Sequence, residues 1–174
     1  MSYVVWLTGL SGSGKSTIAN ILHKKLSKHT TKVTILDGDI VRDFFDGDLG
    51  YTRQERIANI KRIAFVSYIL SKYNILVIVA NIAPYYEARD FIRRKIKNYI
   101  QIYLKADIET CLRRSPKKYY EKFIKGELNN FVGLDEPYDI PRNPHLVVNT
   151  VRYNAEECAE YIYNYLIKKL SFLI

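Results

Sequence analysis

The sequence has little cysteine, no concentration of proline or glycine, and no long hydrophobic run. Its 174 residues include two cysteines (Cys111 and Cys158), five prolines and eight glycines. Two cysteines without a CxxC pair give neither a disulfide framework nor a zinc site. The low proline and glycine content excludes a collagenous or low-complexity chain. The longest strongly apolar run, residues 75–80, is far shorter than the roughly 20 residues that span a bilayer.

What the sequence does contain is typical of one globular domain. Hydrophobic residues make up 48% and charged residues 26% of the chain, so we expect a single domain covering residues 1–174. The first residues carry no basic segment ahead of their apolar stretch, so we expect no secretory signal. Together with the scarce cysteine, this predicts a cytoplasmic protein.

The chain is basic, with a net charge of +9. Such an excess favours a partner that carries several negative charges, and both nucleic acid and small polyphosphates qualify. A nucleic-acid-binding module would use the charge together with the 15 tyrosines. The aromatic residues fall mostly at the spacing of buried strands and helices, so we expect no nucleic-acid partner and no membrane partner. Part of the charge lies in one segment, at Arg113, Arg114, Lys117, Lys118, Lys122 and Lys125.

Strand and helix patterns alternate along the chain. Short apolar runs predict strands over 4–8, 33–36, 75–80, 99–104 and 145–148. Helical spacing predicts helices over 15–28, 53–72, 86–97, 107–113 and 154–170, the second with Ile57, Ile60, Ala64 and Ile69 on its apolar face. Residues 115–143 are predicted to be irregular or partly helical. The pattern indicates an α/β fold in three layers, with a five-stranded parallel sheet covered by helices on both faces.

The polar segments follow the predicted strands. Residues 9–16, 37–42, 81–90 and 105–117 each come directly after a strand. Ligands bind outside the carboxyl ends of the strands in such sheets. The sequence therefore predicts one site at this edge of the sheet, built from four separate segments.

The first of these segments is a phosphate-binding loop. Residues 9–16 read GLSGSGKS and match G-x-x-x-x-G-K-[ST] between a strand and a helix. In this motif backbone N–H groups surround the phosphates, the lysine reaches the β- and γ-phosphates, and the hydroxyl binds Mg²⁺. We therefore predict an ATP and Mg²⁺ site, with Lys15 catalytic and Ser16 a metal ligand. The nucleotide-binding residues predicted here are Gly9, Ser11, Gly12, Ser13, Gly14, Lys15, Ser16 and Thr17.

The second segment carries the acids. Asp37-Gly38-Asp39 follows the second strand, whereas the third strand ends in Asn81 instead of an acid. The chain has no Asn-Lys-x-Asp guanine motif, which excludes a regulatory GTPase. A carboxylate beside the phosphate loop could accept a proton from an acceptor hydroxyl or help to hold Mg²⁺. The alternative is a turn followed by a helix cap, because Asp-Gly-Asp favours turns.

Several further stretches resemble one family. These are WLTGLSGSGKSTIAN at 6–20, LDGD..R at 36–42, DLGY at 48–51, R..NI.R at 56–62, I.PY...RD at 82–90, R.PK..Y at 114–120 and GELNNFVGLDEPY at 126–138. In this order they resemble the adenylylsulfate kinases, which transfer the γ-phosphate of ATP to the 3′-hydroxyl of adenosine 5′-phosphosulfate. The resemblance implies a P-loop kinase-like fold with a lid at about 113–143, and it makes a homodimer plausible.

The resemblance also implies roles for individual residues. Asp39 would be the base or the Mg²⁺-organising acid, supported by Asp37. Lys117 would neutralise the transferring phosphoryl group, and Arg114 would lie over the ATP adenine. The acceptor nucleotide would contact Arg42, Arg56 and Asn59 through its anionic group, and Tyr51 and Phe131 through its base.

The chain departs from the family after the third strand. The family usually reads F-I-S-P-[YF]-R-x-D-R-D there, and this chain reads NIAPYYEARD at 81–90. We expect Asn81, Ile82, Ala83 and Tyr86 to face the acceptor, because the phosphate loop is unchanged while this stretch differs. On that ground the sequence favours cytidine 5′-diphosphoramidate as acceptor, as in the related kinase of bacterial capsule biosynthesis. The alternative is an adenylylsulfate kinase of sulfate assimilation.

Overall fold

The computed structural model describes residues 1–114, 119–127 and 129–170. Its strands are β1 (Val4–Thr8), β2 (Val33–Asp37), β3 (Leu76–Ala80), β4 (Tyr99–Lys105) and β5 (Leu146–Asn149). Its helices are α1 (Lys15–Leu26), α2 (Gly38–Phe44), α3 (Arg53–Lys72), α4 (Tyr86–Lys95), α5 (Ile108–Arg114), α6 (Tyr119–Ile124) and α7 (Ala155–Lys169).

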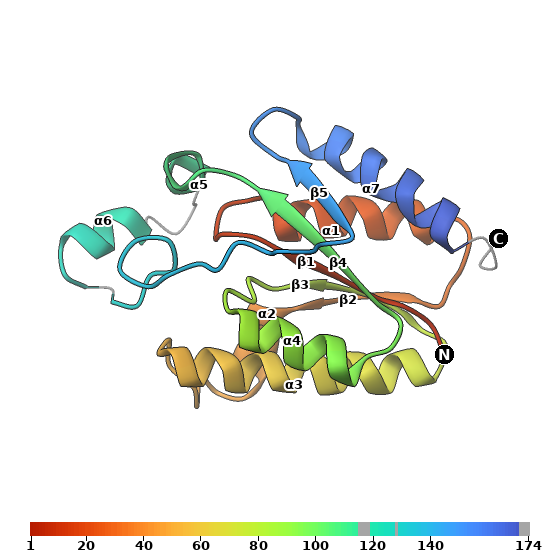
Figure 1. Ribbon diagram of the computed structural model, residues 1–174, viewed down its shortest axis with the longest axis horizontal. Coiled ribbons are helices and arrows are strands. Elements are labelled where there is room, and N and C mark those ends of the chain that lie inside the picture. The colour runs from red at the N-terminus through yellow and green to blue at the C-terminus, as the bar shows by residue number, and fades with distance from the viewer. Residues whose placement is uncertain (115–118, 128, 171–174) are drawn as a thin grey trace.

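The strands form one five-stranded sheet in the order β2-β3-β1-β4-β5, and each neighbouring pair is parallel. Helices cover both faces, with α1 and α7 on one side and α2, α3 and α4 on the other (Figure 1). This confirms the predicted three-layer α/β fold. Parallel strands all end at the same edge, so the segments that follow β1, β2 and β3 meet there.

Two apolar cores fill the space between the layers. On β1, Val5 and Leu7 belong to the core under α1 and α7, whereas Val4 and Trp6 belong to the core under α3 and α4. Successive side chains of a strand point to opposite faces, so a strand that is buried on both faces must be apolar throughout. That is why the strands could be recognised from continuous apolar runs.

Two features of the helices differ from the sequence-based expectation. The seven-residue helix α2 forms where a helix cap was only the alternative interpretation, and Asp37 begins it by accepting a hydrogen bond from the Asp39 amide at 2.9 Å. On α3, Ile69 is 36% exposed instead of buried, while Ile60 and Ile63 are buried. The helix is apolar on two sides, so a single helical period does not describe which side faces the core.

A core substitution in β3 tests this architecture. Ile78 is fully buried and lies between Val5 of β1 and Ile35 of β2. We expect Ile78→Ala to lower the free energy of unfolding by about 3 kcal/mol, because it removes buried methyl groups and leaves a cavity. Urea denaturation measures this loss.

The matched control is Val147→Ala on the edge strand β5, where the side chain is 48% exposed. We expect that change to cost less than about 0.5 kcal/mol. Equal losses for the two variants would contradict the assignment of Ile78 to the core.

Candidate active site

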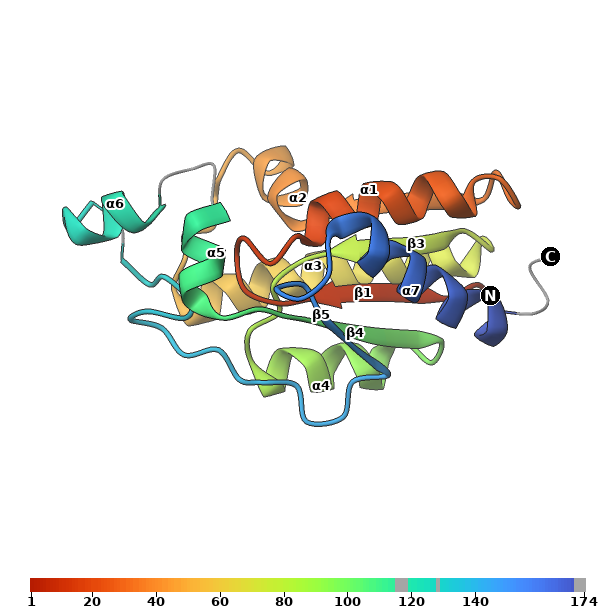
Figure 2. The same ribbon diagram turned by 90° about the horizontal axis from the view of Figure 1, so that it is seen from above.

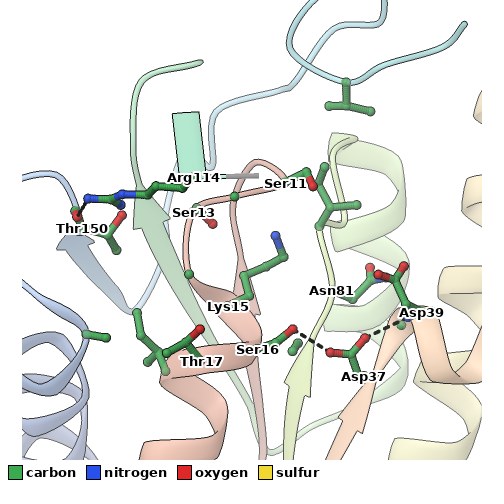
Figure 3. Close-up of a pocket in the computed structure, with 18 of the residues that line it drawn as sticks. Ser11, Ser13, Lys15, Ser16, Thr17, Asp37, Asp39, Asn81, Arg114 and Thr150 are labelled. Carbon is green, nitrogen blue, oxygen red and sulfur yellow. Dashed lines mark hydrogen bonds between the residues drawn. The ribbon is translucent and has the colours of Figure 1, made fainter. Parts of the chain in front are cut away.

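A cleft of about 620 Å³ lies at the carboxyl edge of the sheet. That volume suits a nucleotide-sized ligand. Its lining comes from the loop after β1, the start of α2, the end of β3, α5, the segment 129–132 and the residues after β5. Figure 3 shows Lys15 and Ser16 in the middle, Asp37, Asp39 and Asn81 on one side, and Arg114 and Thr150 on the other. The predicted convergence of segments at one edge is therefore present.

The loop after β1 has the backbone that the phosphate motif requires. Gly14 precedes α1 with φ 93°, a left-handed conformation that side chains rarely adopt. A Cβ on Gly12 would lie 2.3 Å from the Cys111 carbonyl oxygen of α5. Glycine is therefore needed at position 14 for its backbone conformation and at position 12 because α5 approaches so closely.

The lysine of the loop is held at its centre. Lys15 Nζ donates to the Gly9 carbonyl at 2.9 Å and to the Leu10 carbonyl at 2.8 Å. Burial lowers the pKa of Lys15 to about 8, against the opposing effect of nearby Asp39 and Asp37. The buried Ser13 hydroxyl has no hydrogen-bond partner within residues 1–114, 119–127 and 129–170. A buried ammonium and an unsatisfied hydroxyl in one loop fit an anionic, polar ligand.

Asp37 connects the phosphate loop to α2. Its Oδ2 accepts from Ser16 Oγ at 2.7 Å, and its Oδ1 accepts from the Asp39 backbone amide at 2.9 Å. The acid in contact with Ser16 is thus Asp37, whereas the prediction from sequence paired Ser16 with Asp39 as metal ligands. Asp39 lines the cleft beside Asn81 (Figure 3). The two acids therefore have different positions, Asp37 against the Ser16 hydroxyl and Asp39 at the cleft.

The residues expected around the acceptor are only partly brought together. Tyr51, Arg56, Asn81, Ile82 and Phe131 line the cleft. Arg56 donates to the Tyr51 carbonyl at 2.8 Å and to the Asn130 carbonyl at 2.6 Å, and burial lowers the pKa of its guanidinium. It therefore ties the loop before α3 to the segment that carries Phe131.

Two more of the residues predicted to contact the acceptor, Arg42 and Asn59, contact residues of the cleft lining. Arg42 donates to the carbonyls of Leu49 and Gly50 at 2.5 and 2.6 Å, with its guanidinium over the Tyr51 ring. The buried Asn59 donates to the Gly38 carbonyl at 3.3 Å. These contacts hold Tyr51 and the first residue of α2.

Ala83 and Tyr86, which were expected to face the acceptor, do not line the cleft. Ala83 is fully buried, and the Tyr86 hydroxyl donates to the Ile140 carbonyl at 3.0 Å, away from the cleft lining. Both predictions relied on the sequence neighbourhood of Asn81. The chain turns into α4 directly after Pro84, which directs these side chains elsewhere. Lys117, the fourth predicted catalytic residue, lies outside the described residues.

The other end of the cleft brings the predicted Arg114 together with residues after β5 that were not predicted. Arg114 donates to the Thr150 carbonyl at 2.9 Å, and both residues line the cleft with Tyr153 and Cys158. Residues 150–155 follow β5, so the rule that sites form after strands would have found them had it been applied to the fifth strand.

Comparisons with known proteins decide the family. The sequence model of the family described as adenylylsulphate kinase matches residues 1–149. The chain belongs to the adenylylsulphate kinase family. It is 42% identical over 165 residues to a probable adenylyl-sulfate kinase of Aeropyrum pernix, covering 92% of this chain and 90% of that protein. It is 40% identical over 169 residues to the adenylyl-sulfate kinase of a Picosynechococcus species, covering 97% and 93%.

Comparison with solved structures supports the same family. The APS kinase of Mycobacterium tuberculosis in complex with AMPPNP and APS superposes with a TM-score of 0.89 at 34% identity, covering 95% of this chain and 97% of that one. The protein is accordingly an ATP-dependent phosphotransferase that acts on a hydroxyl group of a small nucleotide and uses ATP with Mg²⁺.

The residues that line the cleft fit ATP and Mg²⁺. Mg²⁺ prefers oxygen ligands and takes few of them from the protein when phosphates supply the others. Ser16 and Asp37 offer a hydroxyl and a carboxylate in mutual contact, and no cluster of three or more His, Cys, Asp or Glu that could hold a metal occurs in the described part of the chain. Bound Mg²⁺ would supply positive charge against the phosphates.

No helix among the described residues is long and apolar enough to cross a membrane.

The lowered pKa of Lys15 predicts a pH dependence of nucleotide binding. The charged ammonium is the form that attracts phosphates, and phosphates stabilise it in turn. Without nucleotide the pKa of Lys15 is about 8. Above that pH the side chain is mostly neutral, so ATP binding requires it to take up a proton. We expect the Kd for ATP to rise about tenfold per pH unit above pH 8. Calorimetric titration between pH 7 and 10 measures it.

Lys15→Arg is the control for this titration, because a guanidinium stays protonated over the whole range. We expect weaker binding that does not change with pH. A Kd of the unaltered protein that stayed constant up to pH 10 would contradict the assignment.

Proposed function

We propose that the protein transfers the γ-phosphoryl group of ATP to the ribose 3′-hydroxyl of adenosine 5′-phosphosulfate. The family match over residues 1–149 is the observation that carries this choice. It favours adenylylsulfate over the cytidine diphosphoramidate acceptor, which the relatives described above do not support. The departure from the family sequence at 81–90 is a weaker argument for a different acceptor, because Ala83 and Tyr86 lie outside the cleft lining.

The reaction needs the two substrates placed in line. The acceptor oxygen forms a bond to the γ-phosphorus while the bond to the β,γ-bridging oxygen breaks, and ADP leaves. Asp39 takes the proton of the hydroxyl. Lys15 and the N-terminus of α1 stabilise the negative charge on the phosphates. Most of the catalysis is positioning and electrostatics, because phosphoryl transfer needs little covalent help.

Each end of the cleft holds one nucleotide. Arg114 and residues 150–155 take the adenine of ATP, while Tyr51, Arg56 and Phe131 take the acceptor. Ser16 and Asp37 would hold Mg²⁺, which would supply positive charge to the phosphates. The lid predicted at about 113–143 would close over the phosphates and exclude water, and the predicted role of Lys117 falls on a residue outside the described ones.

The test of this function is a competition between acceptors. Purified protein with ATP and Mg²⁺ is offered adenylylsulfate or cytidine 5′-diphosphoramidate. We expect a kcat/KM at least about 100-fold higher for adenylylsulfate, since a site that pairs with one base leaves buried polar groups unpaired with another. Faster turnover of the cytidine compound would overturn the proposal.

Removing the proposed base tests the mechanism. We expect Asp39→Asn to lower kcat by about 10²- to 10⁴-fold with little change in the KM for ATP, because an amide cannot accept the proton. Asp43→Asn is the matched control, since Asp43 is an exposed acid on the same helix and does not line the cleft. An Asp39→Asn enzyme as active as the control would exclude this role.

We also propose that the chain forms a homodimer. The proposed interface is made of apolar side chains that are exposed on α3 and at the end of α2, namely Phe44, Phe45, Phe65, Val66 and Ile69, of which Phe44 is 80% and Phe65 65% exposed. Exposed apolar side chains of this kind suit an interface between identical surfaces related by a twofold axis. One relative, from Thiobacillus denitrificans, is described as a hexameric APS kinase, at 30% identity and a TM-score of 0.72 over 29% of that chain.

Sedimentation velocity at micromolar concentration tests the dimer. We expect a dimer for the unaltered chain and a monomer for Phe65→Glu, because a charge would be buried without a partner. Tyr161→Glu on α7, where the side chain is 57% exposed, should leave the dimer intact. A Phe65→Glu protein that remained dimeric would exclude the proposed interface.

A further inference from the structure

A strap, residues 129–141, leads from α6 towards β5 and passes alongside the sheet near α4 (Figure 2). It is fixed to the start of α4. The Asp139 amide donates to the Pro84 carbonyl and the Tyr86 amide donates to Asp139 Oδ2, both at 2.8 Å. The buried Arg89 donates to the carbonyls of Ala83 and Asp139. The strap includes Phe131 of the cleft lining, so its anchoring sets one wall of the acceptor end.

A second anchor joins the strap to the end of β1. Thr8 Oγ1 donates to the Ile82 carbonyl at 2.5 Å and lies 3.1 Å from the Tyr138 hydroxyl. A threonine hydroxyl has a single proton, and here it is used on Ile82. Tyr138 must therefore be the donor and Thr8 the acceptor. The result is a directed chain of hydrogen bonds from Tyr138 through Thr8 to Ile82.

This chain of hydrogen bonds connects three segments next to the cleft. Thr8 directly precedes Gly9, the first residue of the phosphate loop, and Ile82 lines the cleft. Burial raises the pKa of Tyr138, which keeps its hydroxyl protonated as a donor. The phosphate loop, the end of β3 and the strap therefore meet at one threonine hydroxyl.

Hydrogen bonds within the strap hold Phe131 in a turn close to Tyr138. The Phe131 amide donates to Asp135 Oδ1 at 2.5 Å, and the Gly133 amide donates to the Glu136 carbonyl at 2.8 Å. The Glu136 amide donates back to the Phe131 carbonyl at 3.2 Å. Residues 131–136 thus form a tight turn that ends two residues before Tyr138.

We propose that Tyr138 is a positioning residue for the acceptor, whose hydrogen bond to Thr8 fixes Phe131 relative to the phosphate loop. The proposal rests on the proposed function for its kinetic consequence, and it concerns a residue that touches neither substrate. Losing the bond lets the strap shift, so the acceptor is placed less often in line with the γ-phosphate, while the ATP end of the cleft keeps its contacts.

The test is Tyr138→Phe, which removes one oxygen and keeps the ring that stacks on Tyr103 at 6.2 Å. We expect the KM for adenylylsulfate to rise about tenfold, the value of one buried hydrogen bond. The KM for ATP should change less than twofold. Thr8→Val should produce a similar rise, and the double variant should add nothing to either single change, because both remove the same bond.

Tyr103→Phe is the matched control, as it removes a hydroxyl from the stacked neighbour without touching the Tyr138–Thr8 bond. We expect its acceptor KM to be unchanged. Equal KM values for Tyr138→Phe and the unaltered enzyme would overturn the proposal. So would a rise in the KM for ATP as large as that for the acceptor, since a general loss of structure would act on both.

A measurement without substrates separates this inference from the proposed function. Amide hydrogen exchange of residues 130–136 should be faster in Tyr138→Phe than in Tyr103→Phe, with exchange in α1 and α7 unchanged. Equal exchange in the two variants would overturn the inference even if adenylylsulfate is the substrate. An unaltered protein inactive on adenylylsulfate would overturn the function, while the exchange result would still decide the role of Tyr138.

Discussion

The carboxylate of Asp37 accepts hydrogen bonds from the Ser16 hydroxyl on one side and from the Asp39 amide on the other. Because of this double contact, the start of α1 and the start of α2 keep a fixed relation. The first carries the phosphate loop, and the second directs Asp39 into the cleft. The side chain that we propose as a metal ligand therefore also begins the helix that presents the proposed base. The parallel sheet makes this contact possible, since β1 and β2 end at the same edge although β3 lies between them.

Much of the fold could be predicted from the sequence because its signals are local. The apolar run 4–8 followed by GLSGSGKS describes a strand, a loop and a helix within a few residues, and all three form as expected. Helix α2 was not preferred because Asp-Gly-Asp is equally good turn chemistry. In the structure Asp37 caps the helix through the Asp39 amide, while its other oxygen contacts Ser16, 21 residues away in the sequence. The exposure of Ile69 was also missed, since periodicity cannot tell which of two apolar sides of α3 faces the core.

The site was predictable on its ATP side and less so on its acceptor side. The phosphate loop is one continuous segment, so its residues are found together. The acceptor end combines the loop before α3, the end of β3 and a strap about 50 residues further on. Where Tyr86 points depends on Ile140 and Asp139, a contact that no local pattern contains. A departure from the family at 81–90 therefore need not alter the acceptor, because part of it packs against the strap instead of lining the cleft.

A ternary structure with a non-hydrolysable ATP analogue and adenylylsulfate tests the central claim most directly, namely that the two nucleotides meet over the edge of the sheet with Asp39 between them. The account predicts the acceptor 3′-oxygen roughly 3–3.5 Å from the γ-phosphorus. It also predicts the Asp39 carboxylate within about 3 Å of that oxygen. An acceptor bound away from Phe131 and Arg56, or a 3′-oxygen that contacts no carboxylate, would contradict it.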